Sequence, residues 1–268
     1  MTPGAPRAAF AANPWARAGG ILLALYVVYA ASTLDFTWER FVKGLDNGAR
    51  FIARMLPPRI AQPDSLVKGL AESMEIAVLA SFIGIMASLP IGLLAARNLM
   101  PAWVTWPARA VIALCRSFHP VIVAIVFVKA VGFGALAGIL ALAVGSVGFI
   151  GKLFAEAIEE ISLKQVEAVR ATGAPFMSVV AYGVMPQVFS RFVGFATYQL
   201  DSNLRNSTMV GIVGAGGIGG TLFSAFQRFD YDFVAAILLS IIFMIMVAEV
   251  LAQWVRGVFL DRGRVQGE

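Results

Sequence analysis

Polar positions are sparse along this chain, and they separate apolar runs that are long enough to cross a bilayer. A helix needs about 20 apolar residues for that. Because the runs are continuous and do not alternate with polar residues, they predict helices and argue against a β-barrel. The pattern predicts an all-α, polytopic membrane protein with about six transmembrane helices. The predicted spans are residues 19–34, 66–96, 103–131, 135–156, 188–213 and 233–255.

The segment between the first two runs has a different pattern. Over residues 38–56, apolar side chains recur at helical spacing while most of the charged side chains fall elsewhere. This predicts an amphipathic helix that lies in the membrane interface. The apolar positions are Trp38, Phe41, Val42, Leu45, Ala49, Ile52 and Met55.

These runs divide the chain into four parts. We expect a flexible cytoplasmic tail over residues 1–18, a span plus interfacial helix over 19–65, a core of spans over 66–260 and a cytoplasmic tail over 261–268. A signal peptide is the alternative for the first apolar run, because basic residues precede it. The long prelude and the bulky Tyr26 and Tyr29 favour a retained anchor.

Composition narrows the function classes. The 268 residues are 59% hydrophobic and 14% charged, with one cysteine and one histidine. A single cysteine excludes an internal disulfide and a cysteine-based metal cluster, and one histidine leaves little room for histidine chemistry. We predict no metal site and no cofactor in the chain. The sequence contains no basic cluster with interleaved aromatic residues, the pattern that would indicate nucleic-acid binding.

Two glycine motifs bear on nucleotide binding. Residues 214–219 match G-x-G-x-x-G, but they follow an apolar span and not a β-strand, so we expect a turn with close helix packing. No G-x-x-x-x-G-K-[ST] phosphate loop occurs in the sequence. The chain is therefore not expected to be an enzyme, and any ATP hydrolysis would lie on a separate subunit.

The distribution of basic residues predicts the orientation. With the N-terminus inside, eleven Lys and Arg residues fall on the inner side and seven on the outer side. Cytoplasmic loops carry the excess of such residues. Six of the seven outer residues lie in the segment 38–68, which is the weak point of this count. We expect both termini, and the polar loop 163–187, in the cytoplasm.

The loop 163–187, LKQVEAVRATGAPFMSVVAYGVMPQ, predicts two short helices. Gly173 supplies a C-terminal stop for the first helix, and Pro175 prevents its simple continuation. The second helix is expected from Phe176 to about Tyr182, before Gly183 and Pro186 break the pattern. Such a loop between two spans is well shaped to be held by another protein.

Within this loop, Glu167-Ala168-Val169, Gly173 and Met185-Pro186 resemble the EAA loop of ABC importer permeases. The spacing from Glu to Gly to Pro matches, and Val169, Gly183 and Met185 depart from the usual residues. The resemblance extends over roughly residues 65–260. The ordinary alternative is a cytoplasmic loop without a coupling role.

The resemblance implies a type I importer fold, in which this loop docks into a cleft of the ATP-binding subunit. The residues it implies for coupling are Glu167, Ala168, Arg170, Gly173 and Pro186. It also implies a homodimer, two ATP-binding subunits that hold ATP and Mg, and a binding protein outside. The segments YGVMPQV, RNSTMVGIVGAGGIG and GKLFAEAIEEI look most like permeases of phosphonate-type systems.

The fifth predicted span is unusually polar over Tyr198–Thr208. A charged residue at mid-membrane costs about 2.5–3.5 kcal/mol on insertion scales, so this helix must face partners or water. We expect Tyr198, Asp201, Arg205, Asn206 and Thr208 to line a translocation path. The alternative is an Asp201–Arg205 pair that neutralises itself within the helix.

Three further ionisable residues punctuate the third run. Arg116 and His119 flank Pro120, which should kink or break the helix, and Lys129 lies near its outer end. They are candidates for the path by default, although a structural role at the break or snorkelling explains them as well. With Arg205 they favour an anionic substrate.

These observations together predict a permease subunit of an ATP-driven importer for phosphonate or a related oxyanion such as phosphite or phosphate. An ABC permease for another small organic anion or an amino acid is the alternative within the class. A secondary transporter or a channel would also use polar spans but would not need the loop 163–187. An intramembrane enzyme lacks a convincing catalytic constellation.

Overall fold

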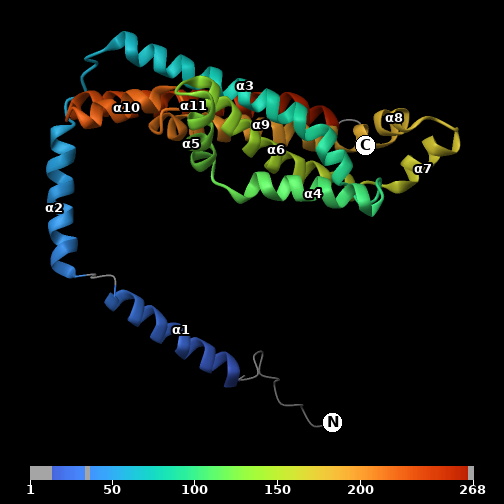
Figure 1. The fold of residues 1–268 in the computed structure, drawn as a ribbon, viewed down its shortest axis with the longest axis horizontal. Coiled ribbons are helices and arrows are strands. Elements are labelled where there is room, and N and C mark those ends of the chain that lie inside the picture. The colour runs from blue at the N-terminus through green and yellow to red at the C-terminus, as the bar shows by residue number, and fades with distance from the viewer. Residues whose placement is uncertain (1–13, 34–36, 265–268) are drawn as a thin grey trace, which may run out of the picture. The chain divides into compact units, whose positions relative to one another are not determined.

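In the computed structural model, residues 14–33 and 37–264 are described, and all regular elements among them are helices (Figure 1). Five of these helices are long and apolar enough to span a membrane, and a sharply bent pair raises the number to six. The prediction of an all-α protein with about six spans is therefore confirmed. The chain divides into two compact units, of which the first ends at Arg54 and the second begins at Met55.

The N-terminal unit contains α1 (Pro14–Thr33) and α2 (Trp38–Arg54). Helix α1 begins before the apolar run. Residues 14–18, predicted as the last part of the flexible tail, are therefore helical. Proline is well tolerated in the first turn of a helix, which explains this start. The rest of that tail, residues 1–13, lies outside the described residues.

Helix α2 confirms the amphipathic helix. Two ion pairs at i, i+4 stabilise its polar side, Glu39–Lys43 at 2.7 Å and Asp46–Arg50 at 2.5 Å. None of its side chains is buried. Its place in the membrane interface stays a prediction.

The second unit is built around α3 (Pro63–Ala95) and α6 (Ala135–Glu159), which pack against each other along their lengths. Small residues permit this close approach. A side chain at Gly84 would lie 2.3 Å from Ser146 Cβ, and one at Gly92 would lie 2.8 Å from a ring carbon of Phe154. The two helices form the frame on which the other spans rest.

The third apolar run is broken as predicted. Helix α4 (Ala102–Ser117) and α5 (Pro120–Val131) meet at 92°. His119 has extended backbone angles, as expected before a proline, and its Nδ1 accepts a 3.4 Å hydrogen bond from Val121 N. His119 therefore caps α5, which is the structural role at the break.

The chain then forms a helical hairpin and three further helices. The hairpin consists of α7 (Leu163–Ala171) and α8 (Phe176–Val179), and it is followed by a π-helical turn, η1 (Val180–Val184). The later helices are α9 (Met185–Ile212), α10 (Ile218–Gln227) and α11 (Tyr231–Arg264). Helices α7 and α8 lie at one end of the second unit and α10 at the other (Figure 1).

The sequence makes predictions for two segments in the C-terminal part, the glycine-rich motif and the tail. The glycine-rich motif forms the turn between α9 and α10, where a Cβ at Gly219 would lie 2.0 Å from Thr208 O, so the prediction of a turn with close packing is confirmed. The first residues of the predicted C-terminal tail, 261–264, are helical and continue α11, and the cytoplasmic place of this tail stays a prediction. No proline follows the span, so the helix has no residue to stop it there. Residues 265–268 lie outside the described part.

Candidate coupling surface and polar path

The hairpin at one end of the second unit forms as the local sequence dictates. Helix α7 ends at Ala171, Thr172 Oγ1 donates to Val169 O at 2.7 Å, and Gly173 follows with φ +76°. That backbone conformation favours glycine and satisfies the last carbonyls of the helix. The predicted stop at Gly173 is confirmed.

The predicted break at Gly183 and Pro186 is wrong. The chain passes from α8 through η1 into α9, and Phe176–Ile212 can act as one span. Met185 N bonds to Val180 O, five residues back. This wider turn restarts the helix, so Pro186 falls in the first turn of α9, where its missing N–H costs nothing.

Gly183 has a packing role in this turn. A Cβ there would lie 3.2 Å from Val166 Cα, so the absence of a side chain lets η1 rest directly on α7. Val166 and Val184 are buried in one apolar cluster with Phe154 and Ile158 of α6. The hairpin therefore shares a hydrophobic core with the frame helices.

Polar contacts fasten both ends of the hairpin. Gln187 accepts from Ser162 N at 3.0 Å and donates to Ser162 O at 3.3 Å and to Gly183 O at 2.6 Å. Arg191 of α9 pairs with Glu160 at 2.5 Å. These contacts join the entry of the hairpin to its exit at the start of α9. Sequence reasoning included Gln187 in the loop but did not identify this role.

The outer side of the hairpin is open. All five predicted coupling residues are exposed: Glu167, Ala168, Arg170, Gly173 and Pro186. Large apolar side chains lie exposed beside them, with Met177 at 72% and Tyr182 at 75%. Charged and apolar groups together in this way are typical of a protein-binding surface.

The polar face of α9 divides into two parts. Gln199 and Asn203 point into the unit and are buried at 6% and 1% exposure. Asn203 Nδ2 donates to Ser81 Oγ of α3 at 2.9 Å and to Ser146 Oγ of α6 at 2.8 Å. Gln199 Nε2 donates to the same Ser146 at 2.9 Å and to Asn203 Oδ1 at 3.0 Å.

This network joins α3, α6 and α9 inside one subunit. Sequence reasoning grouped both amides with the polar surface of the fifth span, and the two serines carried no signal because they sit among small residues. Part of the polarity of α9 is therefore structural and does not face a path.

The other part contains the predicted path residues. Arg205 forms a bidentate pair with Asp201, as the intrahelical alternative stated; the Asp201 side chain is 11% exposed and the Arg205 side chain 46%. The ring of Tyr198 stacks on Phe149 of α6 at a centroid distance of 5.5 Å. Among the described residues, the Asn206 side chain hydrogen-bonds only to Ser202 Oγ, at 3.4 Å.

Comparison with known proteins decides the family. The family described as "Binding-protein-dependent transport system inner membrane component" matches residues 88–264. The chain belongs to this family. It is a permease component of an ABC importer and a multi-span membrane protein.

Named relatives of this permease transport phosphorus compounds. The phosphite transport system permease protein PtxC of Stutzerimonas stutzeri is 40% identical over 86% of this chain and 82% of its own length. The phosphate-import permease protein PhnE of Mycolicibacterium smegmatis is 39% identical over 89% of this chain. The chain spans 44% of the length of that second relative.

Solved structures agree with the fold of this permease. A chain of the MetNI methionine ABC transporter in an inward-facing conformation has a TM-score of 0.64 and 25% identity, over 73% of this chain and 96% of that chain. A chain of an amino acid ABC transporter has a TM-score of 0.59 at 19% identity. The predicted importer-permease fold is confirmed.

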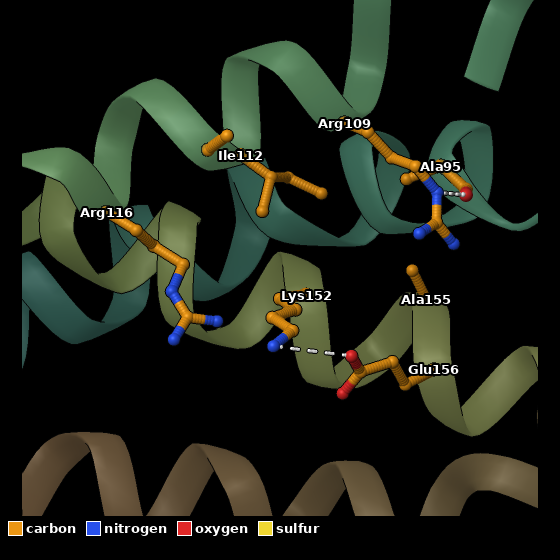
Figure 2. A pocket seen from close by; sticks show the side chains of 8 residues that line it. Ala95, Arg109, Ile112, Arg116, Lys152, Ala155 and Glu156 are labelled. Carbon is orange, nitrogen blue, oxygen red and sulfur yellow. Dashed lines mark hydrogen bonds and ion pairs between the residues drawn. The ribbon is translucent and has the colours of Figure 1, made fainter. Parts of the chain in front are cut away.

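A charged cavity lies where α3, α4 and α6 of the permease meet (Figure 2). Its volume is about 300 Å³, at the lower end of the range of small-molecule sites. Of the predicted path residues, Arg116 lines it, whereas His119, Lys129 and Arg205 are not among its lining residues. The cavity is lined by Ala95, Arg109, Ile112, Ala113, Arg116, Lys152, Ala155 and Glu156.

Glu159 holds together the end of this region that lies next to the hairpin. Its Oε1 accepts from Arg97 N at 2.8 Å and from Arg109 Nη2 at 2.6 Å, and Arg109 Nε also donates to Ala95 O at 2.9 Å. Asn98 Nδ2 donates to Ile158 O at 2.7 Å. These contacts hold the end of α3, the start of α4 and the end of α6 together, directly before the hairpin begins.

Proposed function

We propose that the permease imports a phosphorus oxyanion, namely phosphonate, phosphite or phosphate, by alternating access driven by ATP. The observation that supports the substrate class is the 40% identity to a phosphite permease over most of both chains. The surplus of cations among the ionisable residues of the spans agrees with an anion. The particular oxyanion would be selected largely by a binding protein that delivers it.

Two ATP-binding subunits would hydrolyse ATP and hold ATP and Mg, because no phosphate loop occurs in this sequence. Each would grip an exposed hairpin at Glu167, Ala168, Arg170 and Gly173, with Met177 and Tyr182 supplying apolar contact. This arrangement would place the hairpin and both termini in the cytoplasm. The permease itself would not be an enzyme.

Closure of the ATP-binding subunits would push α7. The shared core around Val166 and the Gln187–Ser162 contacts would pass the displacement to α6 and α9, because packed helices move as rigid elements. The face of α9 that carries the exposed Tyr198 and Arg205 and the half-buried Asp201, Asn206 and Thr208 would line the path. A second copy of the chain would complete the path as a homodimer.

The test is uptake by the assembled complex in proteoliposomes. Radiolabelled phosphite, phosphate and methylphosphonate are supplied outside with the cognate binding protein, and ATP is supplied at the side of the ATP-binding subunits. ATP-dependent accumulation of at least one of these anions is the expected result. Accumulation of methionine or another amino acid alone would contradict the substrate class, and accumulation driven by an ion gradient without ATP would contradict the importer mechanism.

A further inference from the structure

The three cations of the cavity between α4 and α6 differ in how firmly they are held. Arg109 is fixed by two close contacts, to Ala95 O and Glu159. Lys152 has one loose ion pair, in which its Nζ lies 3.5 Å from Glu156 Oε1. No hydrogen bond or ion pair to Arg116 is formed within the described ranges 14–33 and 37–264. Two of the three cations can therefore bind something else.

Gly148 of α6 places Arg116 at the cavity. A Cβ at Gly148 would lie 2.7 Å from Arg116 Cγ and 2.9 Å from Cys115 Cβ. The missing side chain lets α4 lie directly on α6, with the aliphatic part of Arg116 against the helix. Figure 2 shows the guanidinium of Arg116 and the ammonium of Lys152 entering the same space from two different helices.

The charge balance of the cavity is positive. Arg109 is neutralised by Glu159 and Lys152 by Glu156, which leaves the charge of Arg116 in excess. A guanidinium presents a planar set of N–H donors that matches an oxyanion, and an ammonium adds a compact charge with rotatable donors. This combination suits a small tetrahedral anion with several oxygens.

The depth of the cavity favours a water-filled path over lipid. Lys152 lies seven residues before the end of α6, which corresponds to about 10 Å along the helix, and Arg116 packs beside Gly148, about 16 Å from that end. Taking the end of α6 as the edge of the hydrocarbon core, whose half-thickness is about 15 Å, puts Lys152 inside that half and Arg116 near the midplane. Charged side chains at such depths face cavities or partners.

We propose that Arg116 and Lys152 form an oxyanion site in the cytoplasmic half of the translocation path. This inference rests on the proposed function and names where the transported phosphorus oxyanion binds inside the permease. The anion draws Lys152 away from Glu156, and Glu156 takes Lys152 back when the anion leaves. Arg109 does not bind the anion, because Glu159 and Ala95 hold it in place.

A phospholipid headgroup carries the same phosphate chemistry, so the experiment has to separate the two sources. The sequence has one cysteine, so Cys115→Ala gives a cysteine-free chain, and Ala113→Cys then adds a single exposed thiol that lines the cavity. The rate of labelling of this thiol by a charged thiosulfonate reagent is measured in the complete complex. The complex is held in nanodiscs of neutral phosphatidylcholine, with increasing inorganic phosphite, phosphate or methylphosphonate.

We expect these anions to slow labelling. Arg116→Gln or Lys152→Gln should raise the concentration for half-protection by about tenfold or more, the effect of losing a charge-assisted hydrogen bond. Arg116→Lys should retain part of the protection. The matched control Lys68→Gln, an exposed cation near the start of α3, should leave protection unchanged.

Two results would overturn the site. One is slowing by phosphatidylglycerol in the nanodisc but not by phosphite, which would assign the cavity to a lipid headgroup. The other is no slowing by either. ATP-driven uptake separates this failure from that of the proposed function. If the anions do not protect the thiol while Arg116 and Lys152 are intact, and Arg116→Gln and Lys152→Gln still import normally, only the site is rejected. If the unmodified complex shows no uptake, the transport proposal is rejected.

Discussion

The buried hydrogen-bond network of α9 depends on the side chain of Asn203, so replacing this residue should lower the stability of the permease. Asn203 is 1% exposed and takes part in three hydrogen bonds, to Ser81, to Ser146 and from Gln199. Asn203→Ala removes all three and leaves a small void between three helices. The hydroxyl hydrogens of both serines are already donated to backbone carbonyls, at 2.7 Å to Ala77 and 2.8 Å to Leu142.

The magnitude follows from these contacts. Two of the hydrogen bonds join α9 to other helices and the third, from Gln199, lies within α9. Side-chain hydrogen bonds within membranes average about 0.6 kcal/mol each, so the three together amount to about 2 kcal/mol. We expect Asn203→Ala to lower the free energy of unfolding by about 2–3 kcal/mol, including the void. Asn203→Asp should cost more, because its carboxylate would meet one donor, Gln199, and two hydroxyls that already donate elsewhere.

The assay is reversible unfolding of the purified permease in mixed micelles, followed by circular dichroism. Asn206→Ala is the matched control, because it removes the same group from the same helix, three residues later. Asn206 makes a single long contact to Ser202, so its change should stay within about 0.5 kcal/mol. Equal effects of Asn203→Ala and Asn206→Ala would refute the assignment of a structural network.

Three further substitutions test other parts of the fold. Gly183→Leu should separate η1 from Val166, because the close contact leaves no room for a side chain. The variant should still insert into the membrane but no longer stimulate ATP hydrolysis by the ATP-binding subunits. Stimulation at the normal level would contradict this packing. Gln187→Leu should lower the free energy of unfolding by about 1–3 kcal/mol, measured in the same micelle assay, because three hydrogen bonds are lost; an unchanged value would show that the contacts with Ser162 contribute nothing. His119→Ala should cost about 0.5–1 kcal/mol in that assay and His119→Asn less, because only the second retains a capping acceptor; equal losses would argue against the cap.

Much of the fold is readable from the sequence, because bilayer thickness and proline impose strong local constraints. Continuous apolar runs gave the spans, and Pro120 gave the break between α4 and α5. Gly173 marked the end of α7 because its conformation is a local property. These features depend on neighbours within a few residues, which is the range over which sequence patterns carry information.

The remaining features depend on contacts between distant residues. The π-helical turn η1 lets the helix continue past Pro186. The local sequence pattern does not distinguish this continuation from a break in the helix. The amides of Gln199 and Asn203 look like path residues until Ser81 and Ser146 are placed beside them. Arg116 is a candidate path residue because of its position in a span. Lys152 belongs to a different helix, and it becomes a neighbour of Arg116 only through the packing of α4 on Gly148.

The proposed transport mechanism requires that the exposed face of α7 receives the force of ATP hydrolysis. The most direct measurement is the rate of ATP hydrolysis by the cognate ATP-binding subunits, co-purified with the permease carrying Glu167→Arg. Glu167 is exposed, so the fold should tolerate the reversal. Lys68→Glu is the control, an exposed reversal about 40 Å along α3 from the end that meets the hairpin. We predict that Glu167→Arg loses complex formation or the stimulation of hydrolysis by binding protein and substrate, while Lys68→Glu keeps both. Normal assembly and normal stimulation in Glu167→Arg would contradict the account.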